Sequence, residues 1–365
     1  MSIEQPQCLE VALESSSCLH NQSESKLPYA AEYFTGIRSS EPNLTIGNVI
    51  GAIQPILELQ ELEVSDPTKK PLVFIADMHA FTDQDPRDIQ TNRINILKDY
   101  LALGVDPEKT DIFVQSQIAF EVLQMTMALS TLMTIRQIER VPTLKDKVGD
   151  DTKHANMFLA QYPLLMAADI ILQRAHCVPT GKDQKAHIEI TRDLVETINN
   201  RVGELFIPMP ATKDIEPVNI LALKGDGKMS KTDQSRAIML DDDPETIVRK
   251  IRKAQTGTLG EDSPHLKSLI TIGQSLAEDK RVSEALQSLY NEHLAGQGVA
   301  GKVKAVVTEI VLDYTQRYRE NRALIDRSPD ILQDSLAFGA RRARIAAQET
   351  LNELGEKGII LPLFR

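Results

Sequence analysis

Hydrophobic positions follow two different patterns along the chain, and the change between them divides the sequence. Up to about residue 200, short apolar runs alternate with longer segments whose apolar residues recur at helical spacing. Residues 71–77 are a continuous apolar run that ends in Asp77, which is typical of a strand buried on both faces of a parallel sheet. Residues 32–37, 111–115 and 176–179 predict three further strands.

Helices are predicted between these strands. Ile46, Ile50, Ile53 and Leu57 are spaced by four, three and four positions, so they share one helical face. Further helices are expected over residues 85–103, 120–140 and 162–172, and in a segment that runs to Ile198. Strands that alternate with helices predict an α/β fold built on a doubly wound, Rossmann-like parallel sheet.

The second pattern begins after about residue 243 and is helical only, for example over residues 303–318 and 336–354. We therefore expect three parts in this chain of 365 residues. These are a flexible N-terminal extension over residues 1–28, a Rossmann-like sheet domain over 29–235 and an α-helical C-terminal domain over 236–365.

Composition, net charge and cysteine spacing indicate a globular protein and exclude several other classes of protein. Hydrophobic residues make up 42% and charged residues 25%, as in ordinary globular proteins. The net charge of −11 repels nucleic acid, so any RNA contact would need a local basic patch. The three cysteines lie far apart without a CxxC pair, which predicts neither a disulfide framework nor a metal site. No apolar run is long enough for a bilayer and no targeting segment is evident, so a cytoplasmic protein is expected.

Candidate chemistry begins at the loop Gly225-Asp226-Gly227-Lys228-Met229-Ser230-Lys231-Thr232-Asp233. Lys228 and Lys231 stand three positions apart after two glycines that let the backbone bend. Two flexible ammonium groups of this kind could gather around a polyphosphate and follow its charge. From the lysine spacing alone, however, a solvated loop between two domains is the favoured interpretation.

Polar side chains also stand where a predicted strand passes into the next helix. Thr45 and Asn48 begin a helix whose free N–H groups favour an anion, although ordinary capping explains them equally well. His79 follows strand 71–77, at the edge where ligands bind in open α/β sheets, and a structural role is its alternative. Asp183 and Gln184 follow the fourth strand, and capping is again the alternative.

The helix over residues 162–172 places Tyr162, Met166 and Asp169 on one face. Asp169 lies in an otherwise apolar segment, where a carboxylate without a partner is costly. It must therefore accept a hydrogen bond from the protein or from a ligand. An apolar wall, a phenol and one acceptor would suit an aromatic ligand that carries an N–H, whereas periodicity alone favours an internal partner.

Two other groups have a simpler interpretation. Met125, Met127 and Met133 are expected to lie in the core, because methionine fills irregular gaps between helices. The basic residues in 341–344 are expected on a solvated face of the last helix, with contact to a phosphate backbone as the alternative.

In their order, these segments resemble the class I aminoacyl-tRNA synthetases, and most closely the bacterial-type tryptophanyl-tRNA synthetases, over about residues 30–362. Thr45-Ile46-Gly47-Asn48 is similar to the first class I motif. Lys228-Met229-Ser230-Lys231-Thr232 is similar to the second, with threonine where serine is usual. Residues 162–170 resemble the amino-acid pocket helix, and residues 181–194 resemble the segment that joins the ATP and amino-acid sites.

The resemblance implies roles for the site residues. Those implied for tryptophan are Asp169 at the indole N–H, Met166 against the ring, Tyr162, Gln184 and His79. Those implied for ATP are Thr45, Gly47, Asn48, Gly181, Asp183, Lys228, Met229, Ser230 and Lys231. The residues implied as catalytic, because they would carry the phosphate charge, are Lys228, Lys231 and Lys147.

The implied activity is that of a tryptophan–tRNA ligase. The carboxylate of L-tryptophan would attack the α-phosphorus of ATP in line, and pyrophosphate would leave. The helical domain would recognise tRNA(Trp), whose 3′ end would then take the aminoacyl group. Mg2+ would accompany the ATP, and the chain would form a homodimer. A buried acceptor at Asp169 would also reject phenylalanine, which has no side-chain N–H to pair with it.

Some positions depart from the family pattern. Arg38 stands where glutamine is common, Arg136 where glycine is usual and Lys182 where glutamate is usual, and residues 262–267 lack an Arg-Pro-Gly pattern. Two alternatives follow: an adenylate-forming paralogue with a different acceptor, and a non-catalytic paralogue that senses tryptophan or ATP. Tyrosine is the alternative substrate, although Met166 and its helix favour tryptophan.

Overall fold

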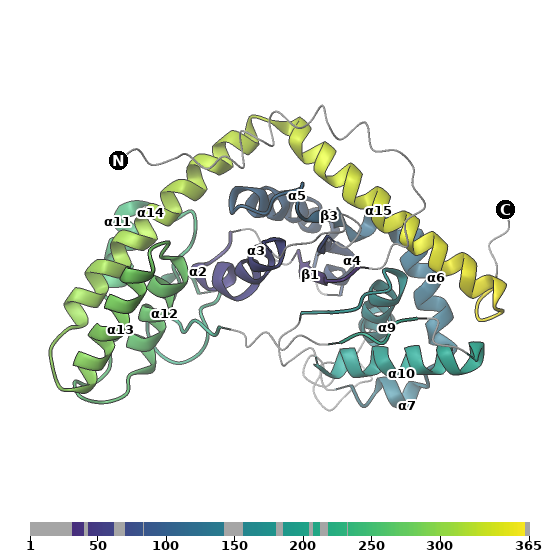
Figure 1. Ribbon diagram of the computed structural model, residues 1–365, viewed down its shortest axis with the longest axis horizontal. Coiled ribbons are helices and arrows are strands. Elements are labelled where there is room, and N and C mark those ends of the chain that lie inside the picture. Colours follow the sequence, from purple (N-terminus) through teal and green to yellow (C-terminus); the bar gives the residue numbers. More distant parts are fainter. Residues whose placement is uncertain are drawn as a thin grey trace.

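Three parallel strands lie at the centre of the molecule (Figure 1). The computed structural model describes residues 31–39, 43–61, 70–82, 84–141, 156–179, 185–203, 207–211, 218–231 and 233–361. The strands β1 (Phe34–Arg38), β2 (Leu72–Ala76) and β3 (Asp111–Val114) are arranged in the order β1-β2-β3. In the register of the sheet, Gly36 lies opposite Phe74, and Phe74 lies opposite Phe113.

The sheet continues beyond β1 through single bridges. Cys177 bridges Tyr33 on one side and Ala211 on the other, both in parallel. The predicted strand over residues 176–179 is therefore reduced to one bridged residue, and Pro179 has no N–H with which to extend it. Because the segment at Cys177 follows β3 in sequence but lies beside β1, the sheet has the strand order of a doubly wound fold.

Alternate residues of each strand pack into two separate hydrophobic cores, because successive side chains point to opposite faces of a sheet. Val73 and Ile75 face a core that contains Ile50 and continues into the C-terminal helices. Leu72 and Phe74 face a second core. All five residues of β2 are buried, in agreement with the continuous apolar run in the sequence.

The first face of the sheet is covered by a helix that follows β1 and by a helix that follows β2. The former consists of α2 (Ile46–Asn48), a π-helical turn (Val49–Ile53) and α3 (Gln54–Gln60) in succession. The latter is α5 (Pro86–Ala102), which starts at the N-cap Asp85 and is followed by Gly104 at a φ of 100°. A short helix, α4 (Asp77–Ala80), comes directly after β2.

The second face is covered by α6 (Ala119–Ser130), α9 (Met157–Leu172) and α10 (Lys185–Val202). The single helix expected over residues 120–140 is wrong, because α6 ends at Ser130 and α7 (Ile135–Ile138) begins separately. The hydroxyls of Ser130 and Thr131 donate to carbonyls three residues earlier, and Thr134 caps α7. Such side-chain bonds to the backbone compete with continuation of a helix.

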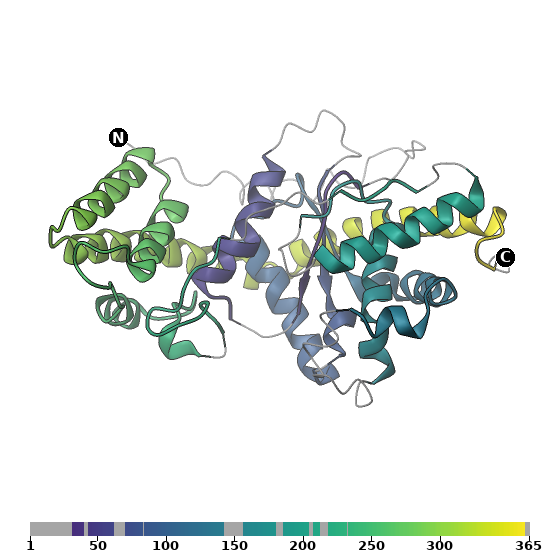
Figure 2. The same cartoon turned by 90° about the horizontal axis from the view of Figure 1, so that it is seen from below.

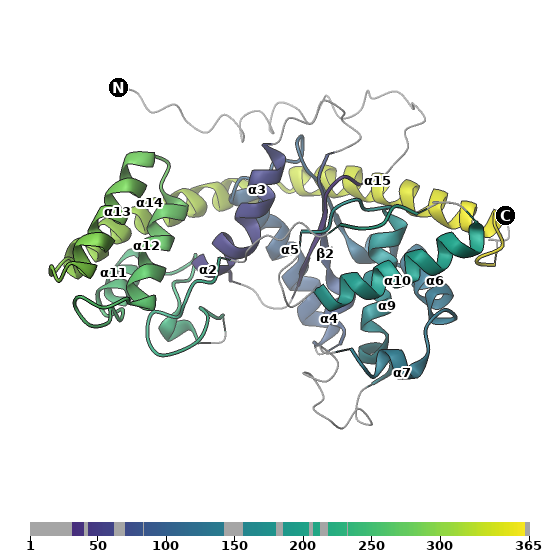
Figure 3. The ribbon, with the colours of Figure 1, turned by 60° about the horizontal axis from the view of Figure 1, so that its bottom comes forward.

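The C-terminal part is helical, as predicted. It contains α11 (Pro244–Arg252), α12 (Pro264–Leu276), α13 (Lys280–Leu294), α14 (Ala300–Asp326) and α15 (Pro329–Glu356). Figure 2 shows the green helices α11–α13 at one end of the molecule and α10 at the other, with the sheet between them. Figure 3 shows α15 passing from the end of α14 back over the sheet region toward α6.

Helix α15 is held against the edge strand β3 by a close approach and by a buried ion pair. A Cβ atom on Gly339 would lie 2.0 Å from the carbonyl oxygen of Ile112, so only glycine allows this contact. Arg342 is buried, and it donates to the carboxylate of Asp111 and to the carbonyl of Lys70. The solvated face predicted for the basic residues is therefore wrong at Arg342, whose guanidinium joins α15 to the sheet.

The buried carboxylate of Asp99 and its partners join α5 to α14. Tyr318 donates to the carboxylate of Asp99 over 2.7 Å, and Arg322 forms an ion pair with the same carboxylate. Asn321 donates to the carbonyl of Ala102 at the end of α5. Burial raises the pKa of Asp99, although the Tyr318 hydrogen bond and the charges of Arg322 and Lys231 oppose this shift.

The raised pKa predicts a pH-dependent stability difference between the wild type and Asp99→Asn. An acid whose pKa is higher in the folded state stabilises the fold below its unfolded pKa, and this contribution is lost as the pH rises. From about pH 4 upward, the free energy of unfolding of the wild type should therefore fall relative to that of Asp99→Asn. Urea unfolding of both proteins between about pH 4 and 7 measures this difference, and parallel pH profiles would contradict the expectation.

Candidate active site

The candidate site lies at the carboxyl edge of the sheet, where the strand order reverses between β1 and Cys177. The helix that follows β1 packs on one face of the sheet, whereas α9, which precedes Cys177, packs on the other. In open α/β sheets, ligands bind in the crevice at such a point. The polar residues that end β2 and β3 meet here.

Thr45 and Asn48, at the start of the first helix, are bonded to one another. Thr45 is fully buried, and its hydroxyl accepts from the Asn48 N–H over 3.1 Å and donates to Asn48 Oδ1 over 2.9 Å. Asn48 Oδ1 also accepts from the Thr45 N–H, which completes a capping box. In this structure both side chains cap the helix, which was one of the two interpretations of the sequence.

The lysine loop is part of a short antiparallel hairpin, and it packs directly on the first class I motif at Gly47. Lys228 bridges Leu221, and the Met229 N–H donates to the carbonyl of Ile220 over 2.8 Å. Met229 is buried, and a Cβ atom on Gly47 would lie only 3.2 Å from Met229 Cβ. The absent side chain of Gly47 thus lets the two motifs touch. Lys228 stays exposed, while Met229 anchors the loop.

Asp169 has internal partners, as periodicity alone favoured. Gln115 Nε2 donates to both carboxylate oxygens, over 2.9 and 2.8 Å, and His79 Nε2 lies 3.0 Å from Oδ2. Burial raises the pKa of Asp169, and the charge of Asp77 raises it further. The hydrogen bond and charge of His79 and the hydrogen bond of Gln115 oppose this rise. A carboxylate has about four acceptor positions, so these bonds leave Oδ1 able to accept a further N–H.

Aromatic rings lie beside this carboxylate. The rings of Tyr162 and His79 meet edge to face with their centroids 4.6 Å apart. The centroid of the Tyr162 ring also lies 5.4 Å from that of His187, which is fully buried on α10. Met166 is partly buried against the core of the second face. The structure therefore gathers Tyr162, His79 and Asp169 into one cluster, with Met166 on the same helix.

A neighbouring buried carboxylate and its partners were missed in the sequence. Asp77, which follows β2, accepts from the Ser116 N–H over 2.9 Å and from the Ser116 hydroxyl over 2.5 Å. Arg93 of α5 donates to Asp77 over 3.1 Å. Gln115 was also missed, although it ends a buried strand as Asp77 does. Strand-end position, the signal that identified His79, would have found Asp77, Gln115 and Ser116.

Some predicted residues lie outside the described part of the chain: Lys147, Gly181, Lys182, Asp183, Gln184 and Thr232, together with the predicted extension over residues 1–28. Two of the departures from the family pattern can be placed. Arg38 ends β1 and donates to the Thr82 hydroxyl over 2.9 Å, while Arg136 is exposed on α7.

Metal ligands do not gather in the described ranges, where no three His, Cys, Asp or Glu side chains are placed to hold an ion. Mg2+ is usually held by one or two carboxylates together with substrate phosphates, rather than by a cage of protein ligands. A magnesium ion that arrives bound to nucleotide phosphates needs no such cage.

Known proteins are similar to this chain in sequence and in fold. Residues 29–311 match the family described as tRNA synthetases class I (W and Y). The tryptophan–tRNA ligase of Rickettsia felis is 34% identical over 326 residues, which cover 86% of this chain and 94% of that protein. The tryptophan–tRNA ligase of Caldanaerobacter subterraneus is 34% identical over 340 residues, which cover 90% of this chain and 98% of that protein.

The fold is also similar to that of a solved synthetase. The tryptophanyl-tRNA synthetase of Campylobacter jejuni, crystallised with ADP and tryptophan, superposes with a TM-score of 0.72 at 31% identity. The similarity covers 89% of this chain and 98% of that one.

Proposed function

The chain belongs to the class I tRNA synthetases of the tryptophan and tyrosine group, and from this premise we infer that it is a tryptophan–tRNA ligase. It activates L-tryptophan with ATP and transfers the tryptophanyl group to the 3′ end of tRNA(Trp). The observation that carries the choice of amino acid is the cluster around Asp169. A buried carboxylate oriented by Gln115 and His79, with Tyr162 and Met166 on the same helix face, suits an indole ring with one N–H.

In this proposal, the chemical step needs positioning and charge stabilisation, but no covalent nucleophile on the protein. The carboxylate of tryptophan forms a bond to the α-phosphorus of ATP while the bond to pyrophosphate breaks. Lys228, Lys231 and Lys147 together offset the negative charge that moves onto the leaving pyrophosphate. The packing of Met229 on Gly47 supports these roles for the lysines, because it fixes the loop next to the first motif.

ATP contacts are proposed for the residues that begin the first helix and for the segment that follows Cys177. The proposed set is Thr45, Gly47, Asn48, Gly181 and Asp183, together with residues 228–231. Gln184 is proposed to hold the polar end of tryptophan near Tyr162 and His79. Mg2+ enters as part of the MgATP substrate, bound to the phosphates.

Pyrophosphate exchange followed by tRNA charging tests the function. We expect tryptophan-dependent exchange of labelled pyrophosphate into ATP, and then charging of tRNA(Trp). Exchange without charging would favour a different acceptor, and binding of tryptophan or ATP without exchange would favour a sensing paralogue. Because the chain contains no tryptophan residue, indole fluorescence in the mixture reports the substrate alone.

We also propose that residues 236–365 recognise the tRNA, that residues 29–235 form the catalytic domain, and that the reaction takes place in the cytoplasm. The position of α15 means that the C-terminal span also contacts the sheet through β3. None of the helices in the described ranges combines the length and apolar character that crossing a membrane requires.

Exposed apolar side chains support the proposal of a homodimer. Met127, expected in the core, is 73% exposed, whereas Met125 on the opposite face of α6 is fully buried. Phe120 and Leu123 are also exposed on α6, and Ile135 on α7 is 75% exposed. Phe120, Leu123 and Met127 recur at helical spacing on one face of α6, and an exposed apolar face of this kind is typical of a protein interface. We assign this face of α6 and α7 to contact with a second copy of the chain.

The dimer predicts an effect of a single charge on this face. Met127→Glu should shift the protein from dimer to monomer at micromolar concentration, because an unpaired carboxylate would be buried in the interface. Light scattering coupled to size-exclusion chromatography measures the molar mass. Leu259→Glu is the matched control, since Leu259 is a similarly exposed apolar residue beyond α11. A monomeric wild type, or a dimeric Met127→Glu variant, would contradict the assignment.

A further inference from the structure

The hairpin that carries the lysine loop is tied to the helical part of the chain by polar contacts to its backbone. His265, near the start of α12, places Nε2 2.9 Å from the carbonyl oxygen of Gly225. Gln255, beyond α11, accepts from the Gly225 N–H over 3.3 Å with its side chain and donates to the Leu223 carbonyl over 2.8 Å with its own N–H. Both polar groups of the Gly225 backbone therefore have partners outside the hairpin.

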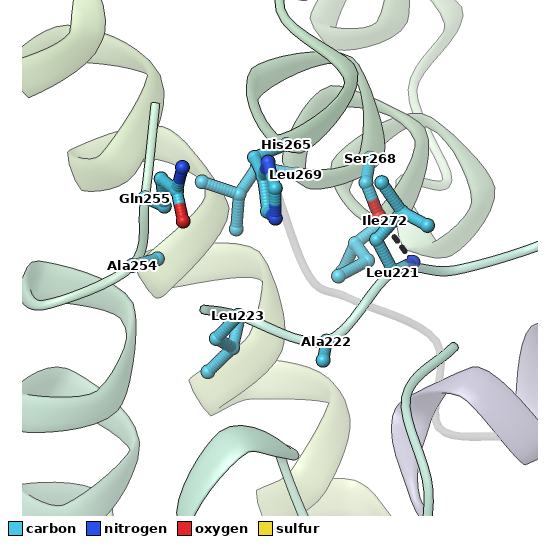
Figure 4. A pocket seen from close by; sticks show the side chains of 9 residues that line it. All are labelled: Leu221, Ala222, Leu223, Ala254, Gln255, His265, Ser268, Leu269 and Ile272. Carbon is cyan, nitrogen blue, oxygen red and sulfur yellow. Dashed lines mark hydrogen bonds between the residues drawn. The ribbon is translucent and has the colours of Figure 1, made fainter. Parts of the chain in front are cut away.

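One face of α12 makes this contact. His265, Ser268, Leu269 and Ile272 recur at helical spacing, and all four line a small cleft opposite residues 221–223 (Figure 4). Ser268 accepts from the Leu221 N–H over 2.9 Å. Leu223, Leu269 and Ile272 are buried in one core, so apolar packing also joins the helix to the hairpin. Hydrogen bonds and apolar packing therefore fix the hairpin against α12 together.

The conformation of the turn at Gly225 also restricts which residue can stand there. Gly225 has a φ of 65°, in the left-handed region, and a Cβ atom there would lie 2.8 Å from a guanidinium nitrogen of Arg236. The Leu223 N–H donates to the carbonyl of Arg236 over 2.8 Å. The turn at Gly225 is thus held by α12 and Gln255 through its backbone, and it lies against the side chain of Arg236. Lys228 follows Gly225 by three residues.

We propose that His265 is a positioning residue for the phosphate chemistry. Its Nε2–H donates to the Gly225 carbonyl and so sets the position from which Lys228 and Lys231 reach the phosphates of ATP. The inference rests on the proposed function, because it presupposes that these lysines act on ATP.

Kinetics of two substitutions at His265 test the proposal. His265→Phe keeps a ring but removes the donor, whereas His265→Gln offers an N–H at a similar distance from the backbone. We expect His265→Phe to lower kcat for tryptophan-dependent pyrophosphate exchange about 5- to 10-fold, the usual effect of one lost hydrogen bond at a positioning contact. His265→Gln should restore kcat to within about twofold of the wild type. The tryptophan Kd, followed by indole fluorescence, should not change in either variant.

Lys267→Ala, an exposed position on the same helix, is the control and should behave as the wild type. An unchanged kcat in His265→Phe, or a loss that His265→Gln does not rescue, would overturn the proposal. An equal loss of tryptophan affinity would do the same, since it would mark a general disturbance of the fold. Failure of the proposed function gives a different result, namely no exchange by the wild type.

Discussion

Replacing Lys231 by alanine is expected to slow formation of tryptophanyl-adenylate by about 10²- to 10³-fold, the usual loss when one preorganised charge partner of a transition state is removed. The affinity for tryptophan should hardly change, because the Asp169 cluster lies at the ends of other strands. Met229 keeps the loop anchored in the variant, so the loss would arise from the missing charge. Single-turnover adenylate formation and indole fluorescence measure the two quantities separately.

Lys224→Ala provides a matched control, because Lys224 is an exposed lysine on the same hairpin but outside the motif. It should retain nearly wild-type rates. The charge of Lys231 also lowers the pKa of Asp99, which otherwise rises through burial between α5 and α14. Urea unfolding of Lys231→Ala should therefore be measured too, to show whether the variant also changes the stability of the contact between α5 and α14. If Lys231→Ala lost tryptophan binding and adenylate formation equally, the loop would be structural.

Asp169→Ala is expected to raise the Kd for tryptophan by about 10- to 100-fold, which corresponds to loss of a hydrogen bond to a charged acceptor in a buried site. The KM for ATP should change little. The variant should also unfold more easily, because Gln115 Nε2 and His79 Nε2 would lose their partner; each unpaired buried donor costs about 1–3 kcal/mol. Indole fluorescence titration and urea unfolding measure the two effects.

Asp169→Asn separates the two roles of the carboxylate. The amide keeps the shape and one acceptor oxygen, so the protein should be more stable than Asp169→Ala, but the amide lacks the charge that strengthens the bond to an indole N–H. We expect the tryptophan Kd of this variant to lie between those of the wild type and Asp169→Ala. An unchanged tryptophan affinity in both variants, together with reduced stability, would mean that Asp169 serves only Gln115 and His79.

The sequence by itself determined the elements that local patterns govern. The apolar run at residues 71–77 predicted β2, and all of β2 is buried. The helix expected over residues 85–103 agrees with α5 to within one residue at each end, because the Asp85 cap and the left-handed Gly104 act within one turn of the helix ends. The strand-end position of His79 led directly to the cluster that the structure contains.

Only the tertiary structure decided what covers each face and which distant groups meet. Periodicity puts Met125 and Met127 on opposite faces of α6, but the neighbouring elements decide that the first face is buried and the second exposed. It could not give Asp169 its partners either, because Gln115 and His79 come from other strand ends.

The same limit applies to Arg342 and His265. Arg342 is buried because α15 returns to Asp111 on β3, and His265 meets Gly225 because α12 folds back on the hairpin. A repeat of 3.6 or 2 residues fixes the direction of a side chain relative to its own backbone. The partner that it meets depends on how the chain closes over long separations, which no local pattern encodes.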